Sequence, residues 1–212
     1  MTGDRKARLF HGIRAFPEGA IYSVYDETKH KVVSFAPDRY WPRFVGIDPF
    51  GAFIAGVWLA YDARSGVLNV YREYYAPFGV TTSEHVKNIL TQSAGETIFA
   101  WAGGGPSERQ ARADFAGAGI PLLPSPVVEV WAGIDRVIQL LAANKLVVHD
   151  NCPQLISEIG GYRRKMKDGN PTEAIEDKET FHLLDALRYI VTYLTDGLDD
   201  GDEVVYNRTS IL

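Results

Sequence analysis

Apolar residues in this chain fall into short runs that are separated by glycine, proline and charged residues. The runs at 44–48, 53–62 and 67–75 are rich in Val, Tyr, Ile and Phe, and the break at 63–66 reads Ala-Arg-Ser-Gly. Runs of this composition with turn residues between them are typical of consecutive strands. We therefore predict an antiparallel meander of three strands in this part of the chain.

Beyond residue 80 the pattern alternates between helical and strand-like segments. We predict helices at 82–92, 108–116, 130–143, 152–164 and 178–194, and strands at 97–101, 120–123 and 146–149. The polar stretch 167–177 contains glycine and proline and is predicted to be a loop. This order predicts an α/β protein with an RNase H-like fold, in which a central mixed sheet combines the antiparallel three-strand meander with later parallel strands, and helices cover both faces.

Length and composition predict one sizeable domain. The chain has 212 residues, of which 46% are hydrophobic, enough for a single core. We place a lead-in segment at 1–40, the domain at 41–196 and an acidic tail at 197–212. The lone Cys152 excludes an internal disulfide, and no Cys/His cluster suggests structural zinc. No apolar stretch approaches 18 residues and none follows the N-terminal cations, so we expect neither a membrane span nor a secretion signal.

The charge pattern bears on possible partners. A net charge of −5 argues against a nucleic-acid binder that uses its whole surface, but it allows a local basic groove. Cations concentrate at Arg163, Arg164, Lys165 and Lys167. This run is either a solvated helix end, where cations suit the dipole, or a patch that tracks phosphates and that Lys178 could join.

Two carboxylates stand in positions that are costly for an acid. Asp48 ends the apolar run 44–48, and Asp185 lies in the apolar helical stretch 181–189. Burying such a group costs on the order of several kcal/mol unless a cation or a partner offsets it. We expect the strand 44–48 to lie near the middle of the sheet, so that Asp48 stands at its carboxyl end, where α/β sheets tend to build their sites. The alternatives are that Asp48 starts a turn before Pro49 and that Asp185 pairs with Arg188.

The order and spacing of five segments resemble the nuclease domain of large terminase subunits from tailed bacteriophages. The resemblance runs from 44 to 195 and rests on Val45-Gly46-Ile47-Asp48, Tyr71-Arg72-Glu73-Tyr74-Tyr75, the glycine turn at 103–110, Val130-Trp131-Ala132-Gly133-Ile134 and the stretch at 182–189. The lead-in, with Gly19-Ala20-Ile21-Tyr22, His30 and Trp41-Pro42-Arg43, is similar to the segment that joins the terminase motor to its nuclease.

The resemblance implies a metal-dependent endonuclease that cuts concatemeric double-stranded DNA when genome packaging starts and ends. It also implies work in the host cell cytoplasm alongside the terminase ATPase domain, the small terminase subunit and the portal protein. No GxxxxGK[ST] loop occurs in the sequence, so we expect this chain not to be the motor and Met1 to begin an excised fragment.

The same resemblance implies a two-metal site for Mg²⁺ or Mn²⁺, which favour oxygen ligands and assist in-line attack of water on phosphate. Asp48 would bridge the metals and Asp185 would hold one. The family places a third acid at the end of the fourth strand, where this chain reads Phe-Ala-Trp-Ala-Gly at 99–103. We assign that role to Glu108, with Glu73 in reserve and with His182 as a weak ligand or orienting group. Glu108 could instead be only a first-turn helix acid or the partner of a helix cap, and His182 only a satisfied core or surface histidine.

Two other classes of function remain open. The missing fourth-strand acid fits a DNA-binding or structural RNase H-like module that has lost catalysis. Another RNase H-like enzyme, such as a resolvase, transposase or exonuclease, would use the same acids on a different DNA substrate.

Overall fold

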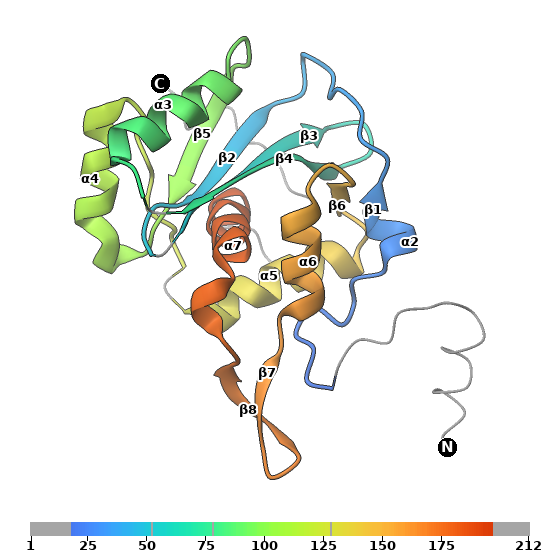
Figure 1. Ribbon diagram of the computed structural model, residues 1–212. Helices are drawn as coiled ribbons and strands as arrows, with labels where there is room; N and C mark the ends of the chain where they lie inside the picture. The colour runs from blue at the N-terminus through green and yellow to red at the C-terminus, as the bar shows by residue number, and fades with distance from the viewer. Residues whose placement is uncertain (1–17, 52, 78, 128, 197–212) are drawn as a thin grey trace.

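The computed structural model describes residues 18–196, except 52, 78 and 128 (Figure 1). A six-stranded mixed sheet has the order β1-β6-β4-β3-β2-β5. The strands are β1 (Lys31–Val32), β2 (Arg43–Asp48), β3 (Phe53–Asp62), β4 (Val67–Pro77), β5 (Ile98–Gly103) and β6 (Leu146–His149). β3 is antiparallel to β2 and to β4, whereas β5 is parallel to β2, and β6 is parallel to β1 and to β4. The predicted meander followed by parallel strands is confirmed.

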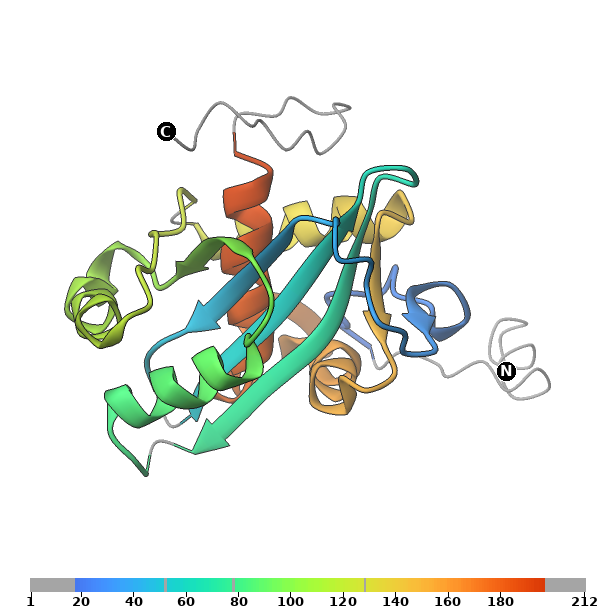
Figure 2. The ribbon, with the colours of Figure 1, turned by 90° about the horizontal axis from the view of Figure 1, so that it is seen from above.

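Helices cover both faces of this sheet, as predicted (Figure 2). They are α2 (Glu27–His30), α3 (Thr82–Gln92), α4 (Arg109–Ala118), α5 (Val130–Ala142), α6 (Pro153–Gly161) and α7 (His182–Leu194), with short 3₁₀ turns η1 (Pro106–Glu108) and η2 (Lys178–Thr180). α3 and α4 share one hydrophobic core with β2, to which Val45 and Ile47 contribute. α5, α6 and α7 share the other core, to which Phe44 contributes. Successive β2 side chains therefore alternate between two buried layers.

Two expectations about the sheet are wrong. β2 lies between β3 and β5 but is one strand from the edge, not near the middle. The predicted strand at 120–123 is reduced to a bridge to β5, in which Leu123 N–H donates to Trp101 O (2.8 Å) and Gly103 N–H donates to Leu123 O (2.9 Å). Pro121 and Pro124 flank this bridge and lack the N–H groups that a longer ladder needs.

The segment predicted as a helix end and a loop is a hairpin, β7 (Arg164–Lys167) and β8 (Asn170–Ile175), which extends from the body (Figure 1). α6 ends with two glycines, and Lys167 pairs with Asn170 across Asp168-Gly169. Asp168 and Gly169 both have positive φ, at 51° and 78°. A two-residue Asp-Gly turn of this kind is a common hairpin connection. The expectation of a helix end and a loop was wrong because it rested on the polar composition of the segment and not on this turn.

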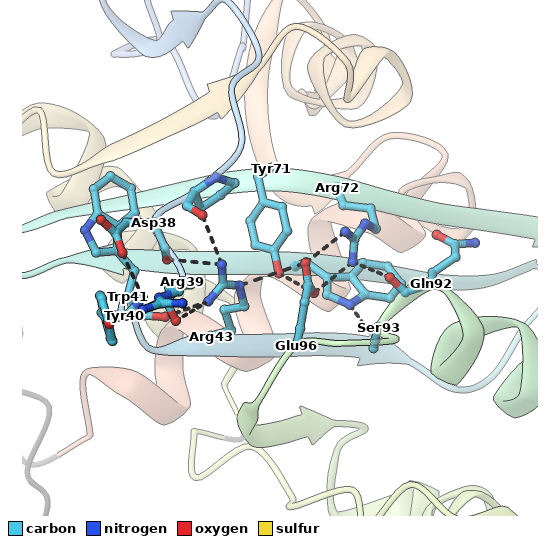
Figure 3. A network of polar contacts seen from close by, with 12 residues as sticks. Asp38, Arg39, Tyr40, Trp41, Arg43, Tyr71, Arg72, Gln92, Ser93 and Glu96 are labelled. Atoms are coloured by element: carbon cyan, nitrogen blue, oxygen red, sulfur yellow. Dashed lines mark hydrogen bonds and ion pairs between the residues drawn. The ribbon is translucent and has the colours of Figure 1, made fainter.

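A polar network fixes the segment that enters β2 (Figure 3). The buried Arg43 guanidinium donates to the backbone oxygens of Pro37, Asp38, Arg39 and Trp41. Glu96 accepts two hydrogen bonds from Arg72 and one from the Tyr71 hydroxyl. Arg43 Nε lies 3.9 Å from Glu96 Oε1, so the start of β2 is linked to the residues that follow α3.

No helix in the described ranges is long and apolar enough to cross a membrane.

Candidate active site

Asp48 is the last residue of β2 and its side chain lies on the α7 face of the sheet. Gly46, two residues earlier on the same face, allows this helix to approach, because a Cβ there would lie 2.1 Å from the Ala186 carbonyl oxygen. Asp48 is 4% exposed. Nδ1–H of His182, the first residue of α7, donates to Oδ2 of Asp48 over 2.7 Å. The two predicted site elements therefore meet at this carboxylate.

The turn after Asp48 packs on the His182 ring. Gly51 has φ 117°, and a Cβ there would lie 2.6 Å from a ring carbon of His182. Phe53 and Tyr75 stack on each other and lie 5.9 and 6.5 Å from the His182 ring, measured between centroids. This environment fixes the imidazole, whose Nε2 is buried without a hydrogen-bond partner among the described residues.

Asp185 lies one helical turn after His182 and is partly exposed. Its Oδ1 accepts a hydrogen bond from Arg188 Nη2 over 2.8 Å, so the alternative pairing considered from the sequence is present. The Arg188 guanidinium also lies 4.7 Å from the Tyr189 ring centroid. Asp185 thus remains a candidate ligand whose orientation Arg188 controls.

Glu108 ends the 3₁₀ turn that follows the glycines of β5. Its Oε2 accepts a hydrogen bond from Gly105 N–H over 2.7 Å, and Arg112 donates to the carbonyl oxygen of the same glycine. The helix-capping alternative for Glu108 is therefore present in the structure. Its charge nevertheless acts at Asp48, which brings the third predicted acid into electrostatic reach of the site.

Burial and the neighbouring charges determine the pKa of Asp48. Burial raises the pKa of Asp48 to about 6; the hydrogen bond from His182 opposes this rise, and the charges of Asp185 and Glu108 add to it. The hydrogen bond to Asp48 in turn raises the pKa of His182. The charges of Asp185 and Glu108 thus act on Asp48, which lies 2.7 Å from Nδ1 of His182.

Glu73, the reserve candidate for a metal ligand, instead contacts the first turn of α6. Its two carboxylate oxygens accept hydrogen bonds from Gln154 N–H (3.0 Å) and Leu155 N–H (2.9 Å) at the start of α6. Glu73 is therefore a helix cap in this structure.

The predicted DNA-binding residues lie on the hairpin and on η2. Arg163 forms an ion pair with Glu176, and the Arg164 guanidinium lies 4.0 Å from the Trp131 ring centroid. Lys165, Lys167 and Lys178 are exposed. The helix-end interpretation of this run is wrong, because Arg164, Lys165 and Lys167 stand on a strand, where alternate side chains face opposite sides, and Arg163 forms a bridge just before it.

One acid near the site was missed by the sequence reasoning. Glu158, on α6, is 4% exposed, and its Oε2 accepts a hydrogen bond from Leu184 N–H over 3.0 Å. Burial raises the pKa of Glu158 to about 7. The signal was available, because Glu158 lies at helical spacing from Leu155 on an otherwise apolar face.

The residues present fit a hard divalent cation. Asp48, Asp185 and Glu108 offer carboxylate oxygens, the ligands that Mg²⁺ and Mn²⁺ prefer, and a cation would offset their mutual repulsion. Within the described part of the chain, no three His, Cys, Asp or Glu side chains are already arranged as metal ligands. Glu108 would have to leave Gly105 N–H to join such a set.

Comparison with solved structures identifies the fold. The nuclease domain of the P22 large terminase superposes with a TM-score of 0.67 at 21% identity, covering 84% of this chain and 94% of that one. The chain has the RNase H-like fold of terminase nuclease domains. The large terminase nuclease from the thermophilic phage G20c, with bound magnesium, gives a TM-score of 0.59 at 14% identity, with coverages of 83% and 98%.

A longer terminase shows the same likeness. For the large terminase of a thermophilic bacteriophage, the TM-score is 0.71 at 20% identity, and the match covers 92% of this chain. This chain spans 53% of that protein's length. No family model matches the sequence, and no curated protein matches it.

Proposed function

We propose that this chain is the nuclease domain of a DNA-packaging large terminase, and that it cuts concatemeric double-stranded DNA at the start and end of packaging with the help of divalent metal ions. The observation that carries the proposal is the buried Asp48 at the end of β2, which faces His182 and Asp185 on α7. The likeness to terminase nuclease domains supports it, as does the magnesium in one of those structures.

Each candidate side chain has a task that follows from its contacts. Asp48 and Asp185, together with Glu108 once it leaves Gly105, would hold Mg²⁺ or Mn²⁺. Such ions stabilise negative charge on the attacking and leaving oxygens of phosphodiester hydrolysis. His182 orients Asp48 through its hydrogen bond, and Arg188 orients Asp185. The exposed Lys165 and Lys167 would contact DNA phosphates without reading sequence.

The proposal extends to the setting of the reaction. The domain would act in the host cell cytoplasm together with a terminase ATPase domain, a small terminase subunit and a portal protein. Sequence preference would be low, because phosphate contacts position DNA without specifying bases.

Cleavage of supercoiled plasmid by the purified chain tests the proposal, with Mg²⁺, Mn²⁺ or EDTA present. Nicking and linearisation should require metal and should fall to the EDTA level in Asp48→Asn and in Asp185→Asn. The same loss in Glu108→Gln would assign the third ligand, and wild-type cleavage by that variant would remove Glu108 from the set. Asp62→Asn, at the opposite end of β3, is the matched control and should cut normally.

Three results would count against the proposal. Cleavage of plasmid by Asp48→Asn at the wild-type rate would show that another site acts. Absence of cleavage by the wild-type chain with every metal would favour the RNase H-like binding module. A strong preference for four-way junctions over linear and supercoiled DNA would favour a resolvase.

A further inference from the structure

α7 carries two residues of the candidate site, yet its first turn has no cap of its own. The N-cap residue Phe181 makes no side-chain hydrogen bond to the helix. Free N–H groups at a helix start need acceptors, and a buried start without them is destabilised. The first turn of α7 is buried at His182, Leu183 and Leu184. The acceptor must therefore come from another element.

Glu158 supplies that acceptor from α6. Its Oε2 accepts a hydrogen bond from Leu184 N–H over 3.0 Å, and the neighbouring Leu183 N–H also favours the charged form of this carboxylate. These are the second and third residues of α7, which a helix N-cap normally serves. A carboxylate also complements the positive end of the helix dipole.

α6 is itself capped in the same way. Its N-cap residue Cys152 makes no side-chain hydrogen bond to the helix. Glu73, which stands on β4, accepts hydrogen bonds from Gln154 N–H and Leu155 N–H instead. Two carboxylates in series thus connect the central sheet to α6 and α6 to α7.

These carboxylates are placed where burial disfavours their charge. Glu158 is 4% exposed, and its Oε1 is buried without a partner among the described residues. Burial raises the pKa values of both Glu73 and Glu158. An apolar residue of similar volume would avoid this cost but would leave the first turn of α7 without an acceptor.

We propose that Glu73 and Glu158 are positioning residues that act in series to fix the first turn of α7, and with it His182 and Asp185, against Asp48. Glu158 makes the direct contact, and Glu73 fixes the helix that carries Glu158. The role in metal binding and cleavage rests on the proposed function, whereas the geometric role does not.

Amide hydrogen exchange and the His182 ring resonances test the geometric role in the full chain. In Glu158→Ala, exchange at Leu183 and Leu184 should accelerate by about threefold to thirtyfold, the range expected for losing a cap. The His182 Nδ1–H signal, which reports the hydrogen bond to Asp48, should shift or broaden. Glu158→Gln keeps an acceptor oxygen and should restore both. Glu96→Gln removes a carboxylate from the Arg72 network and should leave both readouts unchanged.

Titration with Mn²⁺, monitored by the signal of free Mn²⁺, tests whether Glu158 and Glu73 affect metal binding at the candidate site. The dissociation constant should rise by about tenfold or more in Glu158→Ala, as for other residues that orient ligands, and return towards the wild-type value in Glu158→Gln. A smaller rise is expected for Glu73→Ala, which acts through α6.

The outcomes separate this inference from the proposed function. Unchanged exchange and an unchanged His182 signal in Glu158→Ala would overturn the inference. If exchange is faster in Glu158→Ala but the His182 Nδ1–H signal and the Mn²⁺ affinity are unchanged, Glu158 is only a helix cap and has no positioning role. A wild-type chain that neither binds Mn²⁺ nor cuts DNA would remove the proposed function, and the exchange and His182 readouts would still decide the geometric role.

Discussion

At the scale of single residues, Gly46 decides how closely α7 can approach Asp48. A Cβ at this position would lie 2.1 Å from the Ala186 carbonyl oxygen and 2.8 Å from Ile190 Cγ2. Both neighbours belong to the helix that carries His182 and Asp185, and a backbone oxygen cannot move without its helix. The smallest side chain at Gly46 would therefore displace the site.

We expect Gly46→Ala to lower the free energy of unfolding by about 1–3 kcal/mol or more, the usual cost of overpacking a core, and to impair metal binding. Gly117→Ala is a matched control, because Gly117 is in α4 and nothing lies within 4 Å of a Cβ there. Gly117 lies in the last turn of α4, so alanine there should stabilise the protein by at most about 0.5–1 kcal/mol, the value for a glycine in the middle of a helix. Urea denaturation measures both, and equal stability of the two variants would contradict the close approach.

The buried Glu158 predicts a pH dependence of stability. Burial raises its pKa to about 7 from the ordinary value of 4.5, so the folded state binds a proton more tightly than the unfolded state. The stabilisation is complete below the unfolded pKa and is lost as the pH rises through the folded pKa. His182, Tyr75 and Tyr162 are the titratable groups that interact with Glu158.

Glu158→Gln should remove this loss, since the amide stays neutral and keeps an acceptor oxygen. The variant should gain stability relative to wild type between pH 5 and pH 8, by up to about 3 kcal/mol at 1.36 kcal/mol per pKa unit. Urea denaturation of both proteins at the two pH values measures this difference. A difference that does not change with pH would show that Glu158 titrates normally.

At the scale of secondary elements, the β7–β8 hairpin presents the predicted DNA-binding cations. Lys165 and Lys167 are exposed on β7, whereas the neighbouring Arg163 and Arg164 are engaged with Glu176 and Trp131. The two lysines are therefore the members of the run that are best able to meet phosphates.

Replacing both lysines with glutamine should weaken binding to duplex DNA and reduce the steepness of its salt dependence by about 2, because each phosphate contact contributes about 0.9 to that slope. Fluorescence anisotropy at several salt concentrations measures it. The double variant Lys29→Gln and Lys87→Gln changes two exposed lysines on α2 and α3 and should behave as wild type. Equal slopes in the two double variants would place the DNA elsewhere.

Most helices and strands could be predicted from the sequence, but the hairpin and the order of the strands in the sheet could not. The meander and helix 82–92 were predicted because strand-forming apolar runs separated by turn residues, and a helix start signal, are local features of the sequence. The hairpin was missed, although Asp168-Gly169 marks it, because the polar composition of 167–177 is equally typical of a loop. Strand order is a tertiary property, which explains why β2 was placed near the middle of the sheet.

At the scale of the whole molecule, the candidate site is assembled from residues that are far apart in the chain. Asp48 and Asp185 could be selected from sequence because each acid interrupts an apolar element. The direction of the Glu108 carboxylate could not, because it depends on whether Gly105 N–H or a cation is its partner. The role of Glu158 likewise appears only when α6 packs beside α7.

This arrangement predicts that metal binding stabilises the whole fold. Burial and like charges disfavour an ionised Asp48, so a divalent cation that binds only the native state should raise the melting temperature. At a Mn²⁺ concentration about 100 times the dissociation constant, the stabilisation is about 2.7 kcal/mol, or about 5–10 °C for a protein of this size. EDTA should reverse it.

The Asp48→Asn variant distinguishes the destabilisation caused by the buried carboxylate from its role in binding metal. Without metal, the variant should melt at or above the wild-type temperature, because the neutral amide removes the repulsion with Asp185 and Glu108. With Mn²⁺, its melting temperature should not change, whereas Asp62→Asn should show the full wild-type increase. Calorimetry with and without Mn²⁺ measures both. An Asp48→Asn protein that Mn²⁺ stabilises as much as wild type would place the cation away from β2, and the buried carboxylate would then serve only to bind His182.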